Sequence, residues 1–360
     1  MARIVSVYTP ARSRFAPVDM SFVRWWKIAE ALAERGHQVD LASNEPIRWW
    51  RRFVAMGLRL RRVPLARVRW SDYDVVKTEF HMGFTTLEQY GGADHPFIIS
   101  KLGSLVDSRD REGVYFYGAE REKLFRIQER IDARSRYVTL LTRESQTLWQ
   151  QCFQVETPTL LVPGAVDECI PEPGTDPYGD APRPRCLFLG NIYDPHYQPE
   201  VHRCLADRLD QLGSELNSRG IRLYFVGPGD TSHIDPDHVH CVGAVPYAQS
   251  WAFMQHADVS VVLAFGAAPN HNESTKIYHY LRVGLPTVCE SGFPNQGLIE
   301  EAGLGMVTPN GSMSALADAV AMAARADWDR ARAIECVCAA HTWRKRAEVY
   351  GEILRRHGLE

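Results

Sequence analysis

Apolar residues along this chain alternate between short continuous runs and longer stretches with helical spacing. The first run, at residues 4–8, is short and β-branched, as expected of a buried strand. Residues 22–34 then carry apolar side chains three and four positions apart, which predicts a helix that Gly36 ends. Another strand is expected at 39–42. This order is typical of a βαβ unit with parallel strands.

The same alternation continues along the chain with one interruption. In the first half, further elements are expected as strands at 75–76, 97–100, 137–141 and 159–162 and a helix at 120–134. Residues 171–184 hold five prolines and two glycines, so they cannot continue a helix or a central strand and are expected to be a linker. The second half is expected to contain strands at 186–189, 222–226, 239–242, 259–263 and 287–289 and helices at 202–219, 250–256, 275–283, 316–325 and 343–355.

Two alternating halves around a proline-rich joint predict an α/β protein with two doubly wound parallel sheets, each Rossmann-like, facing each other across a cleft. The length of 360 residues agrees, because chains beyond about 250–300 residues usually divide into domains. We expect a first domain at 1–168, a linker at 169–184 and a second domain at 185–340. Residues 341–360 are expected to form a helix that returns to the first domain.

The segment 272–288, NESTKIYHYLRVGLPTV, carries the most specific chemical signal. Ser274 or Thr275 can cap a helix whose N-terminal amides and dipole favour a phosphate group. Lys276 lies in the first turn, where the dipole disfavours a positive charge unless an anion lies in front of it. The segment therefore predicts a diphosphate site, with an ordinary capped helix and a solvated lysine as the alternative.

These residues resemble the donor-binding segment of GT-B glycosyltransferases, Pro/Ser-x-Lys-x-x-Glu-Tyr-x-x-x-Gly-x-Pro. The pattern stands here at Ser274, Lys276, Tyr280, Gly284 and Pro286. Other stretches that are similar to this family follow in the same order along the chain: GHQV at 36–39, VPGAVD at 162–167, LFLGN at 187–191, FVG at 225–227, and HTW at 341–343 with Ala347 and Tyr350. The resemblance implies the GT-B fold and a nucleotide-sugar donor.

A narrower resemblance is to the xanthan-type glucuronosyltransferase, on GNIYDP at 190–195 and on the Ser274–Lys276 helix start. The two resemblances together imply a UDP-sugar donor bound without a metal ion or other cofactor, with Lys276 and the helix N-terminus in place of the metal. The implied donor-binding residues are Gly190, Asn191, Gly227, Glu273, Ser274, Thr275, Lys276 and His279.

The chain departs from the retaining relatives of glycogen synthase, which carry two glutamates eight residues apart at this place. His271 and His279 stand at those positions, and Glu273 is out of register. The retaining mechanism is therefore not carried over, and inversion or retention stays open. His279 is expected to contact the donor ribose or diphosphate, with packing on the first domain as the alternative.

An inverting enzyme also needs a base for the acceptor hydroxyl, expected in loops at the carboxyl ends of the first-domain strands. His81 follows one such strand, with Glu79 beside it, and Asp107 and Asp110 follow another. We expect Asp107 or His81 to be the catalytic base, with a surface-loop role as the alternative for each. The xanthan-type family has its base at the position where this chain has Gly103.

Residues 48–70 hold eight arginines, three tryptophans and no acid. Basic side chains next to aromatic rings are typical of proteins that contact an anionic membrane surface. They predict contact with the membrane and with a lipid-linked or glycan acceptor through Trp49, Trp50, Arg51, Arg52, Arg61 and Arg62. Nucleic acid, which we do not expect as a partner, and a solvated helix with arginine stems on the core are the alternatives.

The composition of the chain indicates a cellular location and a class of function. The chain is 45% hydrophobic and 24% charged, with no long apolar stretch, no signal-peptide pattern and no metal-ligand spacing among its eight cysteines. We expect a cytoplasmic enzyme, peripheral on the inner face of the membrane. The favoured function is sugar transfer in glycan or polysaccharide biosynthesis. A nucleotide-sugar epimerase, a natural-product glycosyltransferase and a non-catalytic scaffold are the alternatives.

Overall fold

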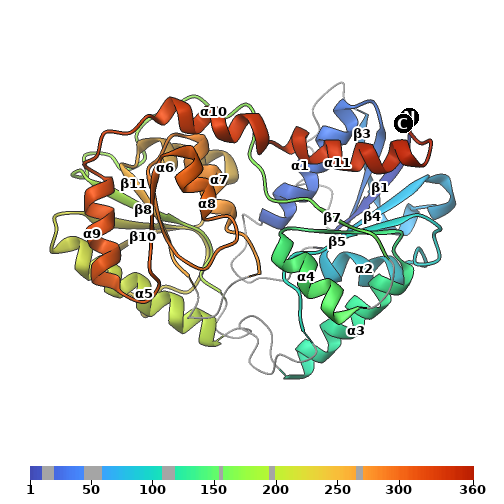
Figure 1. Cartoon of the computed structure of the whole chain (residues 1–360), viewed down its shortest axis with the longest axis horizontal. Helices are drawn as coiled ribbons and strands as arrows, with labels where there is room; N and C mark the ends of the chain where they lie inside the picture. The colour runs from blue at the N-terminus through green and yellow to red at the C-terminus, as the bar shows by residue number, and fades with distance from the viewer. Residues whose placement is uncertain (10–19, 44–58, 108–117, 154–156, 194–198, 265–270) are drawn as a thin grey trace. The chain divides into compact units, whose positions relative to one another are not determined.

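The computed structural model describes residues 1–9, 20–43, 59–107, 118–153, 157–193, 199–264 and 271–360. They form two compact units (Figure 1). The first unit contains the described residues up to Gly164 together with Trp343–Glu360, and the second contains Ala165–Thr342. Each unit is built on one parallel sheet, so the prediction of two Rossmann-like sheets is confirmed.

The first sheet has seven strands in the order β3-β2-β1-β4-β5-β6-β7, and every neighbouring pair is parallel. Its strands are β1 (Arg3–Val7), β2 (Gln38–Ser43), β3 (Leu60–Pro64), β4 (Val75–Glu79), β5 (Ile98–Lys101), β6 (Tyr137–Leu140) and β7 (Thr159–Leu161). The strand order reverses at β1 and β4, and ligands of doubly wound sheets bind outside the carboxyl ends at such a point.

The helices of the first unit are α1 (Met20–Glu34), α2 (Phe80–Gln89), α3 (Gly118–Arg134), α4 (Arg143–Cys152) and α11 (Trp343–Arg356), with short 3-10 turns η2 (Leu65–Arg67) and η3 (Trp70–Asp72). Helix α11 packs against α1. Its Tyr350 hydroxyl lies 3.2 Å from Thr139 Oγ1, and Arg346 donates to the carbonyl of Gly164. The last helix is therefore part of the first unit although it follows the second unit in sequence.

The second sheet has six strands in the order β10-β9-β8-β11-β12-β13. Its strands are β8 (Arg185–Leu189), β9 (Arg222–Val226), β10 (Val239–Gly243), β11 (Val259–Val262), β12 (Thr287–Glu290) and β13 (Gly305–Thr308). Its helices are α5 (Pro199–Asn217), α6 (Tyr247–His256), α7 (Thr275–Arg282), α8 (Gly297–Ala302), α9 (Met313–Ala323) and α10 (Arg330–Ala340). One core packs α5 and α9 against the sheet and the other packs α6, α7, α8 and α10, so both faces are covered.

The proline-rich segment 171–184, expected as a linker, belongs by its contacts to the second unit. Tyr178 is buried there, donates its hydroxyl hydrogen to the Phe253 carbonyl at 2.9 Å, and packs edge-on against Tyr224. The prolines prevent regular structure in this stretch, but Tyr178 still anchors it to the sheet.

Strand β3 and helix α2 are among the elements of the first unit that the sequence pattern did not predict. Strand β3 lies within the basic segment. The pattern does not predict it, because Arg61 and Arg62 interrupt the apolar run that is typical of a buried strand. Helix α2 begins at Phe80, directly after β4, without a side-chain cap from Glu79. Both elements therefore lack the local signals that strands and helix starts usually carry.

Candidate functional site

Two glycine turns meet at the carboxyl ends of β8 and β9 in the second unit. The Gly190 amide donates to the Val226 carbonyl at 3.0 Å, and the Gly227 amide donates to the Gly243 carbonyl at 2.9 Å. Gly227 has φ +151°, and a Cβ there would overlap the carbonyl oxygen of Gly190. This close approach of two backbones requires glycine, so neither turn position carries a side chain.

Lys276, in the first turn of α7, reaches this bare region. A Cβ on Gly190 would lie 2.5 Å from Lys276 Cε and 3.1 Å from its Nζ. The amine also lies 5.1 Å from the centroid of the Phe188 ring. Within the described part of the chain no carboxylate pairs with this amine. The turn after β8 and the start of α7 therefore form one basic corner at the point where the strand order of the second sheet reverses.

The surroundings of Lys276 make its charge unstable when no ligand is present. Removal from water lowers the pKa of the Lys276 amine to about 8, and the weak attraction of Cys289 only partly opposes this. An anion beside the amine would favour the charged form and raise the pKa again. A partly buried lysine of this kind is a candidate for binding an anionic ligand.

The N-terminus of α7 is held from outside the helix. Asn295 accepts a hydrogen bond from the Ser274 amide and donates one to the Ser274 carbonyl, both at 2.9 Å. Ser274 occupies the N-cap position, but its side chain makes no capping bond, contrary to expectation, because Asn295 fixes the backbone instead. Among the described residues, the buried Ser274 Oγ has no partner. That hydroxyl and the first amides of α7 are available to a ligand.

His279 lies on the same helix and is buried. Its Nδ1 donates to the Thr275 carbonyl at 2.9 Å, its Nε2 lies 3.3 Å from the Tyr247 hydroxyl, and its ring packs on Trp251. Tyr247 in turn donates to Asp167 Oδ2 at 3.1 Å, and burial, followed by Asp167, raises the pKa of Tyr247. His279 is therefore fixed in orientation by its own unit.

Two other predicted donor-binding residues are also located in this region. The Glu273 carboxylate accepts a hydrogen bond from Tyr278 at 2.7 Å. With its amide nitrogen turned toward the strand ends, Asn191 donates to the carbonyls of Pro228 at 3.1 Å and Ile192 at 3.0 Å. Asn191 therefore stabilises the glycine turn, whereas Glu273 is connected to the middle of α7.

Of the two base candidates in the first unit, His81 is the more enclosed. It lies in α2, with its Nε2 3.0 Å from Gln128 Oε1. Burial lowers the pKa of His81 to about 4, against the opposing effect of Gln128. This environment makes His81 a weak base near neutral pH.

Asp107 is partly buried in the loop after β5. Gln128 Oε1 also accepts from the Val106 amide at 2.9 Å, so the residue that holds His81 fixes the backbone beside Asp107. The thiol of Cys152 lies 3.8 Å from Asp107 Oδ1. The other aspartate of this loop, Asp110, lies outside the described residues.

At the carboxyl end of β4 the backbone is strained. Phe80 has φ +59°, a left-handed conformation that costs a bulky residue about 1–3 kcal/mol. Its ring lies 4.0 Å from the Lys101 amine and fills the space beside Gly103, where a Cβ would be 2.7 Å from it. Beside it, buried Lys77 and Glu79 form an ion pair. Burial opposes the charge of Lys77, but Glu79 and Tyr350 outweigh it, so the pKa of Lys77 is raised.

The predicted membrane residues are divided between described and undescribed parts. Trp49, Trp50, Arg51 and Arg52 lie outside the described residues, whereas Arg61 and Arg62 lie on strand β3. Arg61 forms a bidentate pair with Asp40, with nitrogen–oxygen distances of 2.8 and 2.7 Å. Among the described helices, none has the length and apolar character needed to cross a bilayer.

Comparison with known proteins gives matches in structure alone. No family model and no curated protein sequence matches the chain. The fold is similar to sucrose-phosphate synthase from Thermosynechococcus elongatus, with a TM-score of 0.68, 15% identity and 99% coverage of both chains. It is similar to HepE of Anabaena in complex with UDP and glucose, with a TM-score of 0.71, 13% identity and coverage of 99% of this chain and 100% of HepE.

A third structure, WaaG, a glycosyltransferase involved in lipopolysaccharide biosynthesis, matches with a TM-score of 0.61 and 14% identity over 97% of this chain and 95% of that one. These matches cover nearly the whole chain in each case, and the chain has the GT-B fold. The expectation of that fold from the sequence is confirmed.

Asn295, Tyr247 and Asp167 were not predicted as parts of the site. Asn295 lies 21 residues from Ser274, and Tyr247 lies 32 residues from His279. Asp167 belongs to the VPGAVD stretch, which carries the family resemblance but indicates no site role for it. No local pattern connects these residues, and only the fold of the second unit brings the segments that carry them together.

Proposed function

We propose that this chain is a glycosyltransferase that transfers a sugar from a nucleotide diphosphate sugar, and that Lys276 and the turn at Gly190 bind the donor's diphosphate. The observation that carries the proposal is the Lys276 amine, which lies against Gly190 where the strand order reverses and has no carboxylate partner in the described chain. A diphosphate would supply the missing negative charge.

The chemistry of sugar transfer requires a stabilised leaving group. As the bond to the sugar breaks, negative charge develops on the diphosphate, and a lysine with helix amides can stabilise that charge without a metal ion. Ser274 Oγ and the amides of Thr275 and Lys276 are the further donors that the site offers. Metal independence is part of the proposal.

UDP is the proposed nucleotide. The support is the match to HepE, which has been crystallised with UDP and with UDP-glucose. We further propose that Asn191, Gly227, Glu273 and His279 complete the donor site, with Asn191 and Gly227 forming its turn.

The acceptor is proposed to bind at the carboxyl ends of β1 and β4, where the order of the first sheet reverses. The strained backbone at Phe80 supports this position, because such strain is concentrated at functional sites. Asp107 is the preferred base, because it is only partly buried, whereas His81 is enclosed in α2 with its Nε2 against Gln128. Asp107→Asn should remove turnover with UDP affinity unchanged, whereas His81→Gln should leave a measurable rate.

A lipid-linked acceptor at an anionic membrane surface is the proposed biological setting, with the enzyme peripheral on the cytoplasmic face. The arginine-rich segment 48–70 supports it, as does the match to WaaG, whose pathway makes lipopolysaccharide. Neutralising Arg51, Arg52, Arg61 and Arg62 together should abolish binding to vesicles that contain phosphatidylglycerol. Unchanged vesicle binding and activity would contradict this setting.

A second candidate is glycosylation of a small molecule. It is favoured by the match to AviGT4, a glycosyltransferase involved in avilamycin A biosynthesis, with a TM-score of 0.64, 16% identity and 99% coverage of this chain and 98% of that one. The two candidates differ in the acceptor alone, so they share the donor site.

The test is UDP release from UDP-glucose, measured without acceptor, with a glycolipid extract and with soluble aglycones. Release that depends on the glycolipid supports the first candidate, and release that depends on an aglycone supports the second. Conversion of the donor without acceptor-dependent release would indicate an epimerase. No release from any nucleotide sugar tried would contradict sugar transfer.

A further inference from the structure

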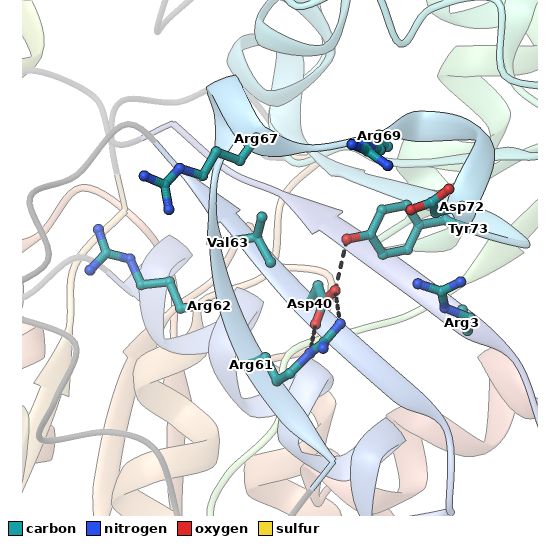
Figure 2. A pocket seen from close by; sticks show the side chains of 9 residues that line it. All are labelled: Arg3, Asp40, Arg61, Arg62, Val63, Arg67, Arg69, Asp72 and Tyr73. Atoms are coloured by element: carbon teal, nitrogen blue, oxygen red, sulfur yellow. Dashed lines mark hydrogen bonds and ion pairs between the residues drawn. The ribbon is translucent and has the colours of Figure 1, made fainter.

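An open pocket of about 350 Å³ lies on the first unit, over β2 and β3 (Figure 2). Arg3 opens β1 and Tyr73 precedes β4 by two residues, whereas Val63 lies near the end of β3 and Arg67 follows it, so the pocket extends along the outer strands of the sheet. The proposed acceptor position is at the carboxyl ends of β1 and β4, which the lining of this pocket does not include. The pocket is lined by Arg3, Asp40, Arg61, Arg62, Val63, Arg67, Arg69, Asp72 and Tyr73.

The floor of the pocket is rigidly built. Asp40 and Arg61 are direct neighbours across β2 and β3, and the buried Asp40 carboxylate accepts two hydrogen bonds from the Arg61 guanidinium. Tyr73 donates a third hydrogen bond to Asp40 at 2.7 Å. Burial, followed by Asp40, raises the pKa of Tyr73, so this hydroxyl remains a donor. Figure 2 shows Tyr73 and Arg61 meeting at Asp40 from two sides.

The rim of the pocket, formed by Arg3, Arg67 and Arg69, carries positive charge that the Asp40 carboxylate in the floor does not neutralise. Arg3 lies over the Tyr73 ring at 5.6 Å, and Arg67 and Arg69 are exposed. No carboxylate of the described chain forms an ion pair with Arg67 or Arg69. Asp40 is paired with Arg61, which leaves Asp72 as the other acid in the lining. Several arginines around one small pocket repel one another unless an anion lies between them.

We propose that this pocket is a binding site for a phosphate group. Guanidinium groups bind phosphate oxygens through paired hydrogen bonds, and Arg61 is already held in place by Asp40. The ring of Tyr73 orients Arg3 from the side. The site is separate from the proposed diphosphate site, which belongs to the second unit, so it does not depend on the proposed sugar transfer.

The phosphate group could come from a lipid headgroup or from a soluble phosphate, and the experiment uses one probe for each source. The first probe is inorganic pyrophosphate, titrated calorimetrically with saturating UDP present so that the donor site is filled. The second is flotation with vesicles of phosphatidylcholine containing phosphatidylglycerol. Both are measured at low and at physiological salt, because binding to exposed arginines weakens as salt screens the charges.

The variant Arg67→Gln/Arg69→Gln removes two rim charges from exposed positions and leaves the Asp40–Arg61–Tyr73 floor intact. Its matched control is Arg126→Gln/Arg143→Gln, which removes two exposed charges of the same unit outside the pocket. Equal melting temperatures of the two variants establish that both are folded. The rim variant should bind its probe at least about tenfold more weakly than the control.

Pyrophosphate binding that is lost only in the rim variant supports the site and identifies a soluble phosphate as its ligand. Vesicle binding that is lost only in the rim variant, without pyrophosphate binding by the wild type, supports the site and identifies a lipid headgroup. If the two variants bind both probes equally, or if the wild type binds neither, the site does not exist. That result would not contradict the proposed sugar transfer, which depends on a different site.

Discussion

Gly190 and Lys276 fit together so closely that a side chain on the one would displace the other. A Cβ at position 190 would lie 2.5 Å from Lys276 Cε, shorter than carbon atoms can approach without a shift. The LFLGN turn and the STK helix start, 86 residues apart in sequence, therefore depend on each other. Their contact defines the proposed diphosphate site.

Gly190→Ala should weaken UDP binding by about tenfold or more, because the new methyl group displaces the lysine amine from the phosphate position. Calorimetric titration with UDP measures the effect. Gly297→Ala is the control, since a Cβ there meets no atom within 4 Å. UDP affinity that is the same in both variants would show that Lys276 does not need the space beside Gly190.

The affinity for UDP should fall as pH rises through about 8. The pKa of Lys276 is lowered to about 8 in the free protein, so the amine loses its charge above that pH. Bound diphosphate favours the charged form, and binding above pH 8 should therefore be accompanied by proton uptake. Titrations at pH 7 and pH 9 in buffers of different ionisation enthalpy measure both effects. Lys276→Arg should show no such loss, because arginine stays charged.

Asn295→Ala should weaken UDP binding and lower the free energy of unfolding by about 2 kcal/mol. The variant loses two hydrogen bonds to the Ser274 backbone, worth about 1 kcal/mol each, and the start of α7 is no longer fixed. Asn217→Ala is the matched control, because Asn217 makes a similar side-chain bond to the Asp237 carbonyl at the end of α5. A drop in UDP affinity in both variants would indicate general loosening of the unit.

Glu79→Gln should lower the free energy of unfolding by about 3–5 kcal/mol, because it leaves Lys77 charged and buried without its carboxylate. Replacing both residues, as in Lys77→Met/Glu79→Leu, should recover much of that loss. Urea unfolding of the two variants makes the comparison. A double variant that is no more stable than Glu79→Gln would mean that the pair is not coupled in this way.

The periodic apolar pattern was sufficient to predict the two sheets, since most strands are buried apolar runs such as residues 222–226, which form β9. Strand β3 was missed because it lies at the sheet edge and carries Arg61 toward Asp40. Helix α2 was missed because it begins in the strained residue Phe80, which no cap precedes. Edge strands and strained turns are determined by tertiary contacts, and local sequence patterns do not predict those contacts.

The sequence predicted individual residues of the candidate site but not the contacts between them. Lys276 and Gly190 were found from local motifs, whereas their contact requires the sheet. His81 was expected on an open loop, but it lies in a helix against Gln128, a residue 47 positions away. A polar residue beside a strand end can face the site or the core, and only the packing of the neighbouring helix decides which.

The most direct test of the account is the affinity of wild type and Lys276→Ala for UDP at pH 7, measured by calorimetry alongside their melting temperatures. We expect binding at least about tenfold weaker in the variant, because one charge-assisted contact to the diphosphate is lost. We expect no loss of stability, because burial in the ligand-free protein lowers the pKa of Lys276, so its charge opposes folding. Equal UDP affinity in the two proteins would contradict the proposed position of the donor.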